Sequence, residues 1–449
     1  MVGRDTVAGG SLGVLRDREF LALSGTAFAR AQAYSTIAIA LALYADMLGT
    51  SSTVEGLFAT VFALAQFVIV LPLGRKIDTG NAKRYLLAGL VLNVGVFVGF
   101  WMVDSVADIL LVRVVQGLGA SLLWITGSTV VGEISPDGER GQWLGTYNQV
   151  GAFSSFAGDL VGAYLLDVHG FGVTYAVLAG VTAFATLLLY SWLRDNPGGR
   201  ADPDEQSGRE AIERLLSRTP IRALVVFRFG LSFGKMCVIL FLPIYAVTVL
   251  DIPTLYVGGI LAGGKLTKAL TQGYVGGLTD RVGSKHLFVF VGALLYAVGA
   301  LLIPFAGLAG AYFSAMTVAG YTLTPGFQVL FIAFGVCGVA DSIRLPASMA
   351  LFVEEGEQFD AVAASMSLRS IAWKVGQITG PFLVGVVWDL TDVFTAFGVA
   401  SVTIVFAALA FITLYTVDPI PDLVDEEPVD LTPGGPNQCD EDASGADDD

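Results

Sequence analysis

Apolar runs that are long enough to cross a lipid bilayer recur along the whole of this chain. A membrane-spanning helix needs about 20 apolar residues. The sequence offers twelve such runs, at about 20–45, 54–74, 85–103, 107–132, 141–166, 172–193, 221–249, 255–278, 286–306, 328–353, 360–388 and 393–416. Only 14% of the 449 residues are charged, against roughly a quarter in a soluble domain. We therefore predict an all-α polytopic protein of the lipid bilayer.

The basic residues that flank these runs all fall on one side of the predicted membrane topology. The loops on the opposite side carry acids, such as Asp46 and Asp389, and they carry neither Lys nor Arg. Loops rich in Lys and Arg stay in the cytoplasm. Both termini are therefore expected in the cytoplasm, in a multi-pass protein of the cell membrane.

A single long polar segment, 195–220, divides the runs into two sets of six. We predict an N-terminal six-helix bundle at 1–194, a cytoplasmic linker at 195–220 and a C-terminal six-helix bundle at 221–416. The linker is either a short helix on the membrane surface, with Ile212, Leu215 and Leu216 on one face, or a flexible tether. The acidic segment 417–449 is too polar to pack, and we expect it to be disordered.

The two predicted bundles resemble each other in sequence. Asp78 and Asp280 close similar turns and stand 202 residues apart, whereas Glu133 and Glu354 stand 221 apart. This change of register indicates an insertion of about 20 residues at 307–326, forming an external loop or a re-entrant segment. Repeated bundles of this kind hold their substrate at the interface between them, near the middle of the membrane.

Two short motifs give the chain its resemblance to a known family. Residues 276–285 read Gly-Gly-Leu-Thr-Asp-Arg-Val-Gly-Ser-Lys, and residues 113–120 read Arg-Val-Val-Gln-Gly-Leu-Gly-Ala. They resemble the inter-helix and fourth-helix signatures of the major facilitator superfamily, nearest to its proton-linked, drug-antiporter-like branch. Gly158-Asp159 departs from that branch, which has Gly-Pro there. The resemblance implies twelve helices in two bundles, and alternating access without enzymatic chemistry or a cofactor.

The resemblance also implies a conformational latch at the cytoplasmic ends of the helices. A carboxylate there can accept hydrogen bonds from the start of another helix, and Arg75, Lys76 or Arg281 could pair with Glu133 or Glu354. The alternative is that these basic residues simply flank the spans on the cytoplasmic side, without forming a latch. The expected latch comprises Gly74, Asp78, Glu133, Gly276, Asp280, Arg281 and Glu354.

Cations outnumber acids inside the predicted spans. Unpaired cations cannot face lipid, so we expect them to line a wet cavity whose potential favours a small, organic anion. Arg228 and Arg369 lie nearer the cytoplasmic end and could reach toward it along their stems. The expected substrate-binding residues are Arg30, Tyr34, Lys235, Lys268, Arg344 and Lys374.

Three intramembrane residues are expected to couple transport to an ion, which is a proton or sodium. Arg113 needs a partner within its span, and Asp159 is one candidate. Asp341 and Arg344 are three residues apart on one helix and can bridge each other. A substrate that competes for Arg344 would leave Asp341 free to bind a proton. The expected coupling residues are Arg113, Asp159 and Asp341.

Two other functions fit parts of the sequence. One is a multidrug antiporter that exports apolar or cationic compounds, which the fourth-helix motif favours and the intramembrane cations disfavour. The other is a non-transporting sensor or a membrane-bound enzyme. Against the latter, the sequence contains no nucleophile elbow, zinc motif or phosphate loop. We expect a monomer without a metal site and without a nucleic-acid partner.

The latch hypothesis makes a direct prediction. Asp280→Asn should abolish most transport while leaving membrane insertion intact, because the neutral side chain no longer complements a helix N-terminus. Uptake into whole cells and the amount of protein in the membrane fraction would be measured together. Wild-type uptake by this variant would refute the latch.

Overall fold

The structure is a computed structural model that describes residues 11–79, 81–136, 139–195, 209–318, 320–359 and 361–417. The predicted all-α class is confirmed. The helices before the linker are α1 (Ser11–Val14), α2 (Arg18–Leu48), α3 (Ser52–Thr79), α4 (Ala82–Trp101), α5 (Val106–Ile134) and α6 (Arg140–Trp192). The linker contains α7 (Arg209–Ser217), and the later helices are α8 (Thr219–Thr248), α9 (Thr254–Val282), α10 (Lys285–Leu302), α11 (Pro325–Glu357), α12 (Val362–Leu390) and α13 (Val393–Val417).

Ten of the described helices are each long and apolar enough to span a membrane. Two features account for the difference from the twelve predicted runs. Helix α6 has 53 residues and is broken at Gly170, whose φ of 70° is outside the helical region, so it supplies two spans. Helix α9 has 29 residues but is less apolar, because its interior carries Lys265 and Lys268. The lysines of such a span cannot face lipid, so they need polar partners or water.

Local sequence signals set several helix ends. The Asp17 carboxylate accepts a hydrogen bond of 2.8 Å from the Phe20 backbone N–H at the start of α2. Ser105 and Asp108 form a capping box at the start of α5. Gly49 ends α2 in the left-handed conformation, with a φ of 57°, where glycine carries no Cβ penalty. These caps end each helix sharply, so that the next helix can run in the opposite direction after a short loop.

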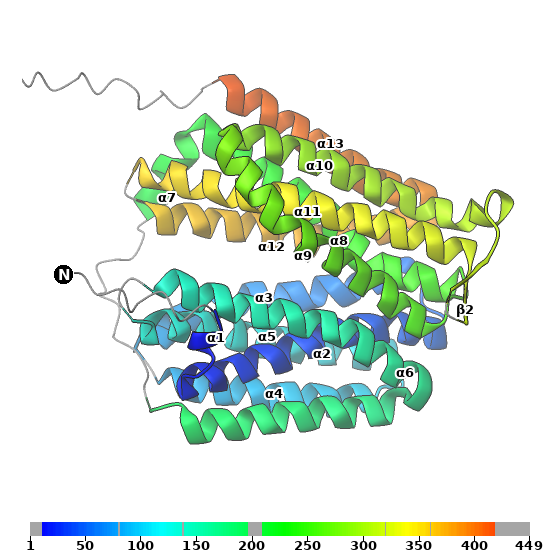
Figure 1. Ribbon diagram of the computed structural model, residues 1–449, viewed down its shortest axis with the longest axis horizontal. Helices are drawn as coiled ribbons and strands as arrows, with labels where there is room; N and C mark the ends of the chain where they lie inside the picture. The colour runs from blue at the N-terminus through cyan, green and yellow to red at the C-terminus, as the bar shows by residue number, and fades with distance from the viewer. Residues whose placement is uncertain are drawn as a thin grey trace, which may run out of the picture.

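The helices form two layers, with α2–α6 in one and α8–α13 in the other (Figure 1). We call these the first and second halves. Helix α2 begins and α13 ends at the same end of the molecule, on the left of Figure 1, which we call the terminal end. The other end, which holds the small hairpin described below, is the hairpin end. The halves meet where α3 packs against α12, α6 against α9 and α2 against α8.

The linker contains a short helix, α7, at the terminal end. Of the three apolar residues expected on one face, Leu215 is fully buried and packs in a cluster with Ile221, Ala364 and Leu368, with Ile212 beside it. Leu216 is 37% exposed. Helix α7 is therefore docked onto the start of α8 and α12, which decides between the two readings of this segment in favour of the helix.

The predicted insertion at 307–326 contains part of a 3-10 helix and a short hairpin. It begins earlier than expected, with a 3-10 helix, η2 (Ile303–Ala311), that continues α10. It then forms an antiparallel hairpin of β1 (Met316–Val318) and β2 (Tyr321–Leu323), with Met316 opposite Leu323. The strands project at the hairpin end (Figure 1), and Tyr312, Met316 and Tyr321 are exposed.

The two halves are in direct contact toward the hairpin end. The Asp389 carboxylate at the end of α12 accepts hydrogen bonds of 2.8 Å from the backbone N–H groups of both Ser52 and Thr53, at the start of α3. Glycine allows the backbones to touch nearby. A Cβ on Gly385 would overlap the Ser52 carbonyl, and one on Gly56 would overlap that of Pro381. This end is therefore closed by main-chain packing and a shared helix cap.

Adjacent glycines of α9 test this closure. A Cβ on Gly258 would overlap Ala163 and the carbonyl oxygen of Asp159 in α6, whereas a Cβ on Gly259 meets nothing within 4 Å. Gly258→Val should force the halves apart at the hairpin end, and Gly259→Val should not. The measurement is labelling of a cysteine at Ala38, in a background without native cysteines, by an impermeant maleimide applied from the hairpin side. Equal labelling of both variants would contradict this account.

Candidate functional site

The largest cavity that we describe is about 570 Å³ and lies between the two halves. This volume falls within the range of small-molecule sites. Helices α2, α3, α4 and α5 of the first half and α8 and α12 of the second provide its walls. Among the described residues that line it, none is Asp or Glu, whereas five are cationic: Arg30, Arg228, Lys235, Arg369 and Lys374.

Two of these arginines lie over tryptophan rings. The Arg30 guanidinium carbon is 4.3 Å from the centre of the Trp124 ring, and that of Arg228 is 4.1 Å from the centre of the Trp373 ring. A desolvated cation–π contact contributes about 2 kcal/mol, which is less than the several kcal/mol that burial of an ion costs. Stacking therefore orients the two guanidiniums but does not neutralise them.

Lys374 ties the second half to the first within this cavity. Its ammonium group donates hydrogen bonds to the side-chain oxygens of Gln66 in α3 and Gln377 in α12. Thr60 of α3 donates a hydrogen bond of 2.7 Å to the carbonyl oxygen of Ile378 nearby. The amide oxygens solvate the Lys374 charge without cancelling it.

A smaller cavity of about 220 Å³ adjoins the first. Lys235, Tyr34 and Ile239 line both. Along α2 the smaller cavity extends to Ala38, whereas the larger one includes Arg30, so the larger cavity lies nearer the terminal end. The charged residues of the smaller cavity are Asp159, Lys235, Lys265, Lys268 and Asp341.

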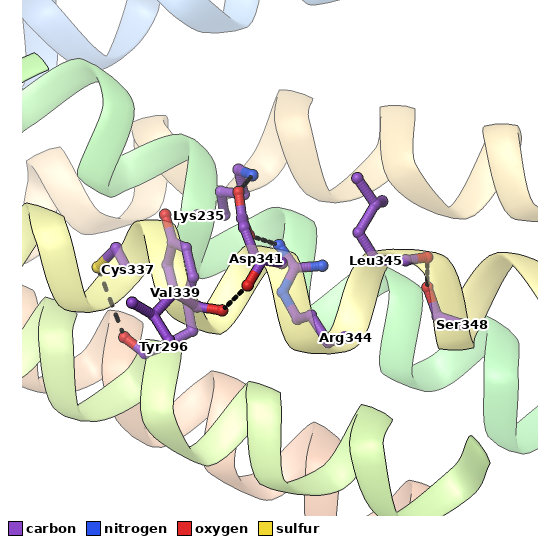
Figure 2. Close-up of polar contacts among 9 residues, drawn as sticks. Lys235, Tyr296, Cys337, Val339, Asp341, Arg344, Leu345 and Ser348 are labelled. Carbon is purple, nitrogen blue, oxygen red and sulfur yellow. Dashed lines mark hydrogen bonds and ion pairs between the residues drawn. The ribbon is translucent and has the colours of Figure 1, made fainter. Parts of the chain in front are cut away.

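Asp341 of α11 is the centre of an ionic cluster (Figure 2). Its two carboxylate oxygens accept hydrogen bonds from the Lys235 ammonium, which reaches across from α8, and from Arg344 Nη2 on the same helix. The predicted Asp341–Arg344 bridge is confirmed. The Tyr296 ring lies under both cations, 5.7 Å from Lys235 Nζ and 5.4 Å from the Arg344 guanidinium carbon.

Arg344 is not placed where direct substrate binding was expected. Its side chain is 1% exposed and lines neither of the two cavities described above. It lies behind Asp341, packed against α10, where a Cβ on Gly292 would crowd its own Cβ. Arg344 therefore orients Asp341, and Lys235 is the cation that reaches both Asp341 and the larger cavity.

Asp159 pairs with a residue that the sequence analysis did not select. Its carboxylate lies 2.6 Å from the Lys265 ammonium, which also donates hydrogen bonds to the hydroxyls of Ser35, at 2.9 Å, and Ser155, at 2.7 Å. Lys265 belongs to α9 in the second half, and the other three residues belong to the first. This ion pair therefore bridges the halves.

The suggested pairing of Arg113 with Asp159 is wrong. Arg113 is 4% exposed and donates hydrogen bonds of 2.7 Å to the Phe58 carbonyl oxygen and 2.6 Å to Gln116 Oε1. Its guanidinium carbon lies 4.2 Å from the centre of the Phe62 ring. Arg113 finds these partners on its own helix and the adjacent α3, so its charge is solvated without a carboxylate.

The structure gathers the other expected residues around the two cavities. Arg30, Tyr34, Lys235 and Lys374 line the larger one, and Tyr34, Lys235, Lys268, Asp159 and Asp341 line the smaller. The residues that were missed are Lys265, Arg228 and Arg369, together with Trp124 and Trp373. One signal was available, because Arg228 and Lys235 are seven residues apart and share a helix face.

The latch residues all lie toward the terminal end. Residues 71–79, 276 and 280, and with them Gly74, Asp78, Gly276 and Asp280, are outside the residues whose side chains the structure describes. Glu133 lies near the end of α5. Glu354 pairs with Lys285 and not with Arg281, because Lys285 begins α10, which packs against α11 in the same half. The latch stays a prediction.

The sequence matches the family described as Major Facilitator Superfamily over residues 23–320 and 265–433. It is 24% identical to the human (Homo sapiens) MFS-type transporter SLC18B1 over 360 residues, 77% of this chain and 74% of that protein. It is 24% identical to the quinolone resistance protein NorA of Staphylococcus aureus over 376 residues, which cover 82% of this chain and 90% of that one.

Solved structures with the same fold include the nucleoside transporter NupG, with a TM-score of 0.69 at 14% identity over 88% of this chain and all of that one (100%). A POT family transporter in complex with 5-aminolevulinic acid also has a TM-score of 0.69, at 12% identity, over 89% of this chain and 96% of that one. At these identities the likeness shows a shared fold.

Proposed function

We propose that this chain, which belongs to the Major Facilitator Superfamily, is a secondary transporter that moves a small organic anion by alternating access. The observation that carries the proposal is the larger cavity, which has five cationic side chains and no Asp or Glu among its lining residues. Buried cations without carboxylates attract an anion, because it repays part of their desolvation cost.

The cavity offers an anion both charge and directed hydrogen bonds. A guanidinium can hold a carboxylate or phosphate through two parallel N–H donors, and Arg30, Arg228 and Arg369 each supply such a group. Lys235 and Lys374 add point charges. Trp124, Trp373 and Phe62 give an apolar wall for the body of the solute.

Alternating access would use the contacts between the halves. We propose that the terminal end faces the cytoplasm, as the distribution of Lys and Arg predicts. The larger cavity then lies on the cytoplasmic side of the closed hairpin end. Opening of the other side would part α3 from α12 and break the Asp159–Lys265 pair. The latch at the terminal end would form as that side closes.

Proton coupling would act through Lys235 rather than through Arg344. Lys235 bonds to Asp341 and also lines the larger cavity. A bound anion would draw the Lys235 ammonium away from Asp341, and a carboxylate that loses a cation in an apolar setting binds a proton more readily. Arg113 and Asp159 remain the other proposed coupling residues, with the Asp159–Lys265 pair as the second candidate for protonation.

A multidrug antiporter is the second candidate function. Two relatives favour it, namely NorA and the multidrug resistance protein MdtG of Yersinia enterocolitica, which is 23% identical over 391 residues, 85% of this chain and 89% of that protein. The lining of the larger cavity argues against it for cationic compounds, since it carries no carboxylate to receive them.

The decisive experiment is counterflow in proteoliposomes with a panel of organic anions, sugars and cationic drugs. We expect saturable exchange of anions, because only they compensate the cationic lining. Protein-free liposomes and liposomes with heat-denatured protein are the controls. Exchange of cationic drugs alone would overturn the proposal and establish the antiporter.

The coupling proposal predicts that Asp341→Asn abolishes the effect of a pH gradient on uptake but leaves counterflow of the same anion intact. Counterflow needs no net proton movement, whereas gradient-driven uptake does. Asp104→Asn, an exposed change at the hairpin end, should leave both unaltered. If Asp341→Asn keeps its pH dependence while Asp159→Asn loses it, the coupling carboxylate is Asp159. If both keep it, proton coupling through these residues is wrong and a sodium gradient becomes the driving force to test.

A further inference from the structure

We infer that the transported anion is a dianion, with one negative charge held by Arg30 of the first half and the other by Arg228 and Arg369 of the second. This inference rests on the proposed transport of organic anions and narrows the substrate to molecules with two negative charges. Dicarboxylates and phosphate monoesters share that chemistry.

Three guanidiniums in the larger cavity have unused hydrogen-bond donors. The Nε atoms of Arg30, Arg228 and Arg369 are buried and have no hydrogen-bond partner among the described residues, and all three side chains line the larger cavity. A buried donor without an acceptor is costly, and native proteins rarely keep one without a reason. These Nε atoms are themselves sealed from the cavity, and Arg218 and Arg344, which do not line it, also have unpartnered Nε atoms. The uncompensated charge of the three cavity guanidiniums, rather than their Nε donors, therefore favours an anionic ligand.

Two of the three guanidiniums lie over a tryptophan ring of their own half. Arg30 rests on Trp124, and both belong to the first half, whereas Arg228 rests on Trp373, and both belong to the second. A stacked guanidinium has its face covered and its edge, which carries the N–H groups, still available. Each half therefore supplies to the cavity at least one guanidinium that a ring of the same half holds in place, and a guanidinium can bind an anionic group through two donors.

The positive charges around the larger cavity exceed the nearby negative charges by more than one. Asp341 is bonded to Lys235 and to Arg344. Among the described residues, no ion pair joins Asp341 to Arg30, Arg228 or Arg369. Arg228 and Arg369 carry like charges and line the cavity from the same half. One negative charge placed between these two would leave Arg30, in the opposite half, uncompensated. Two separated negative charges satisfy both sides of the cavity.

A dianion would also hold the two halves together, because its two charged groups bind to different halves. Its monoanionic analogue can engage the guanidiniums of only one half at a time. Loss of a charge-assisted hydrogen-bonding site lowers affinity by about 10- to 100-fold. In a series of matched ligands, we therefore expect the net negative charge of the ligand, and not its size, to have the strongest effect on affinity.

The test uses purified full-length protein and pairs of ligands that share a skeleton but differ in charge. The pairs are succinate with butyrate, glutarate with valerate, terephthalate with benzoate, and phenyl phosphate with its methyl ester. Affinity is obtained from the concentration dependence of the ligand-induced rise in melting temperature. The tightest dianion should bind at least about 10-fold more tightly than its monoanionic partner. The ligand with the highest affinity shows whether the preferred dianion is a phosphate monoester or a dicarboxylate.

Three variants test whether the preference for the dianion depends on Arg30 and Arg228. Arg30→Gln and Arg228→Gln should each weaken the tightest dianion by about 10- to 100-fold and affect its monoanionic partner much less, which brings the ratio near one. Arg228→Lys keeps the charge without the planar fork and should be intermediate. Arg222→Gln is the matched control, because Arg222 lies on the same helix, is exposed and bonds to carbonyl oxygens of Leu216 and Ser217. The melting temperature without ligand reports whether each variant folds.

The outcomes separate this inference from the proposed function. A ratio below about threefold in the wild-type protein, a monoanion as the tightest ligand, or an unchanged ratio in Arg30→Gln would overturn the dianion but leave anion transport standing. Binding of cationic drugs alone, or of none of the anions, would contradict both.

Discussion

The cost of placing charge inside a bilayer decides most of this structure. A cation in a membrane-spanning helix must find a carboxylate, an amide or carbonyl oxygen, an aromatic face or a ligand. The protein uses each of these solutions. Lys265 and Lys235 have carboxylates, Lys374 has two amide oxygens, and Arg113 has a carbonyl oxygen, an amide and a ring. Among the described residues, Arg30, Arg228 and Arg369 of the larger cavity have neither a carboxylate in an ion pair nor a hydrogen-bond partner for Nε.

The same constraint links the site to the movement of the halves. The Asp159–Lys265 and Lys374–Gln66 contacts both join one half to the other. They lie beside close approaches that only glycine permits, such as Gly258 against α6 and Gly56 against α12. The polar contacts favour one relative position of the two halves, and the glycines allow the helix backbones to come close enough to adopt it. In the proposed mechanism, the transported anion and a proton would act on the same few interactions that hold the halves in place.

The sequence predicts the fold well and the pairings poorly, for a physical reason. Hydropathy is a property of whole helices, so it reveals the spans, and the changed register between the repeated halves reveals the insertion. Depth along a span, however, does not say which neighbouring helix a side chain faces. Arg113 and Asp159 were therefore matched wrongly, and Arg344 was expected in a cavity although it lies behind Asp341. Arg228 and Arg369, for which a reach toward the cytoplasm was one possibility, line the larger cavity, where Arg228 lies over the indole of Trp373.

The central claim is that one anion binds between cationic groups of both halves. The most direct measurement is a cryo-electron microscopy structure of the protein with the anion that exchanges fastest in counterflow. This account predicts ligand density in the larger cavity, in contact with the guanidinium of Arg30 on one side and those of Arg228 and Arg369 on the other. Density confined to the smaller cavity, or touching the arginines of one half alone, would contradict it.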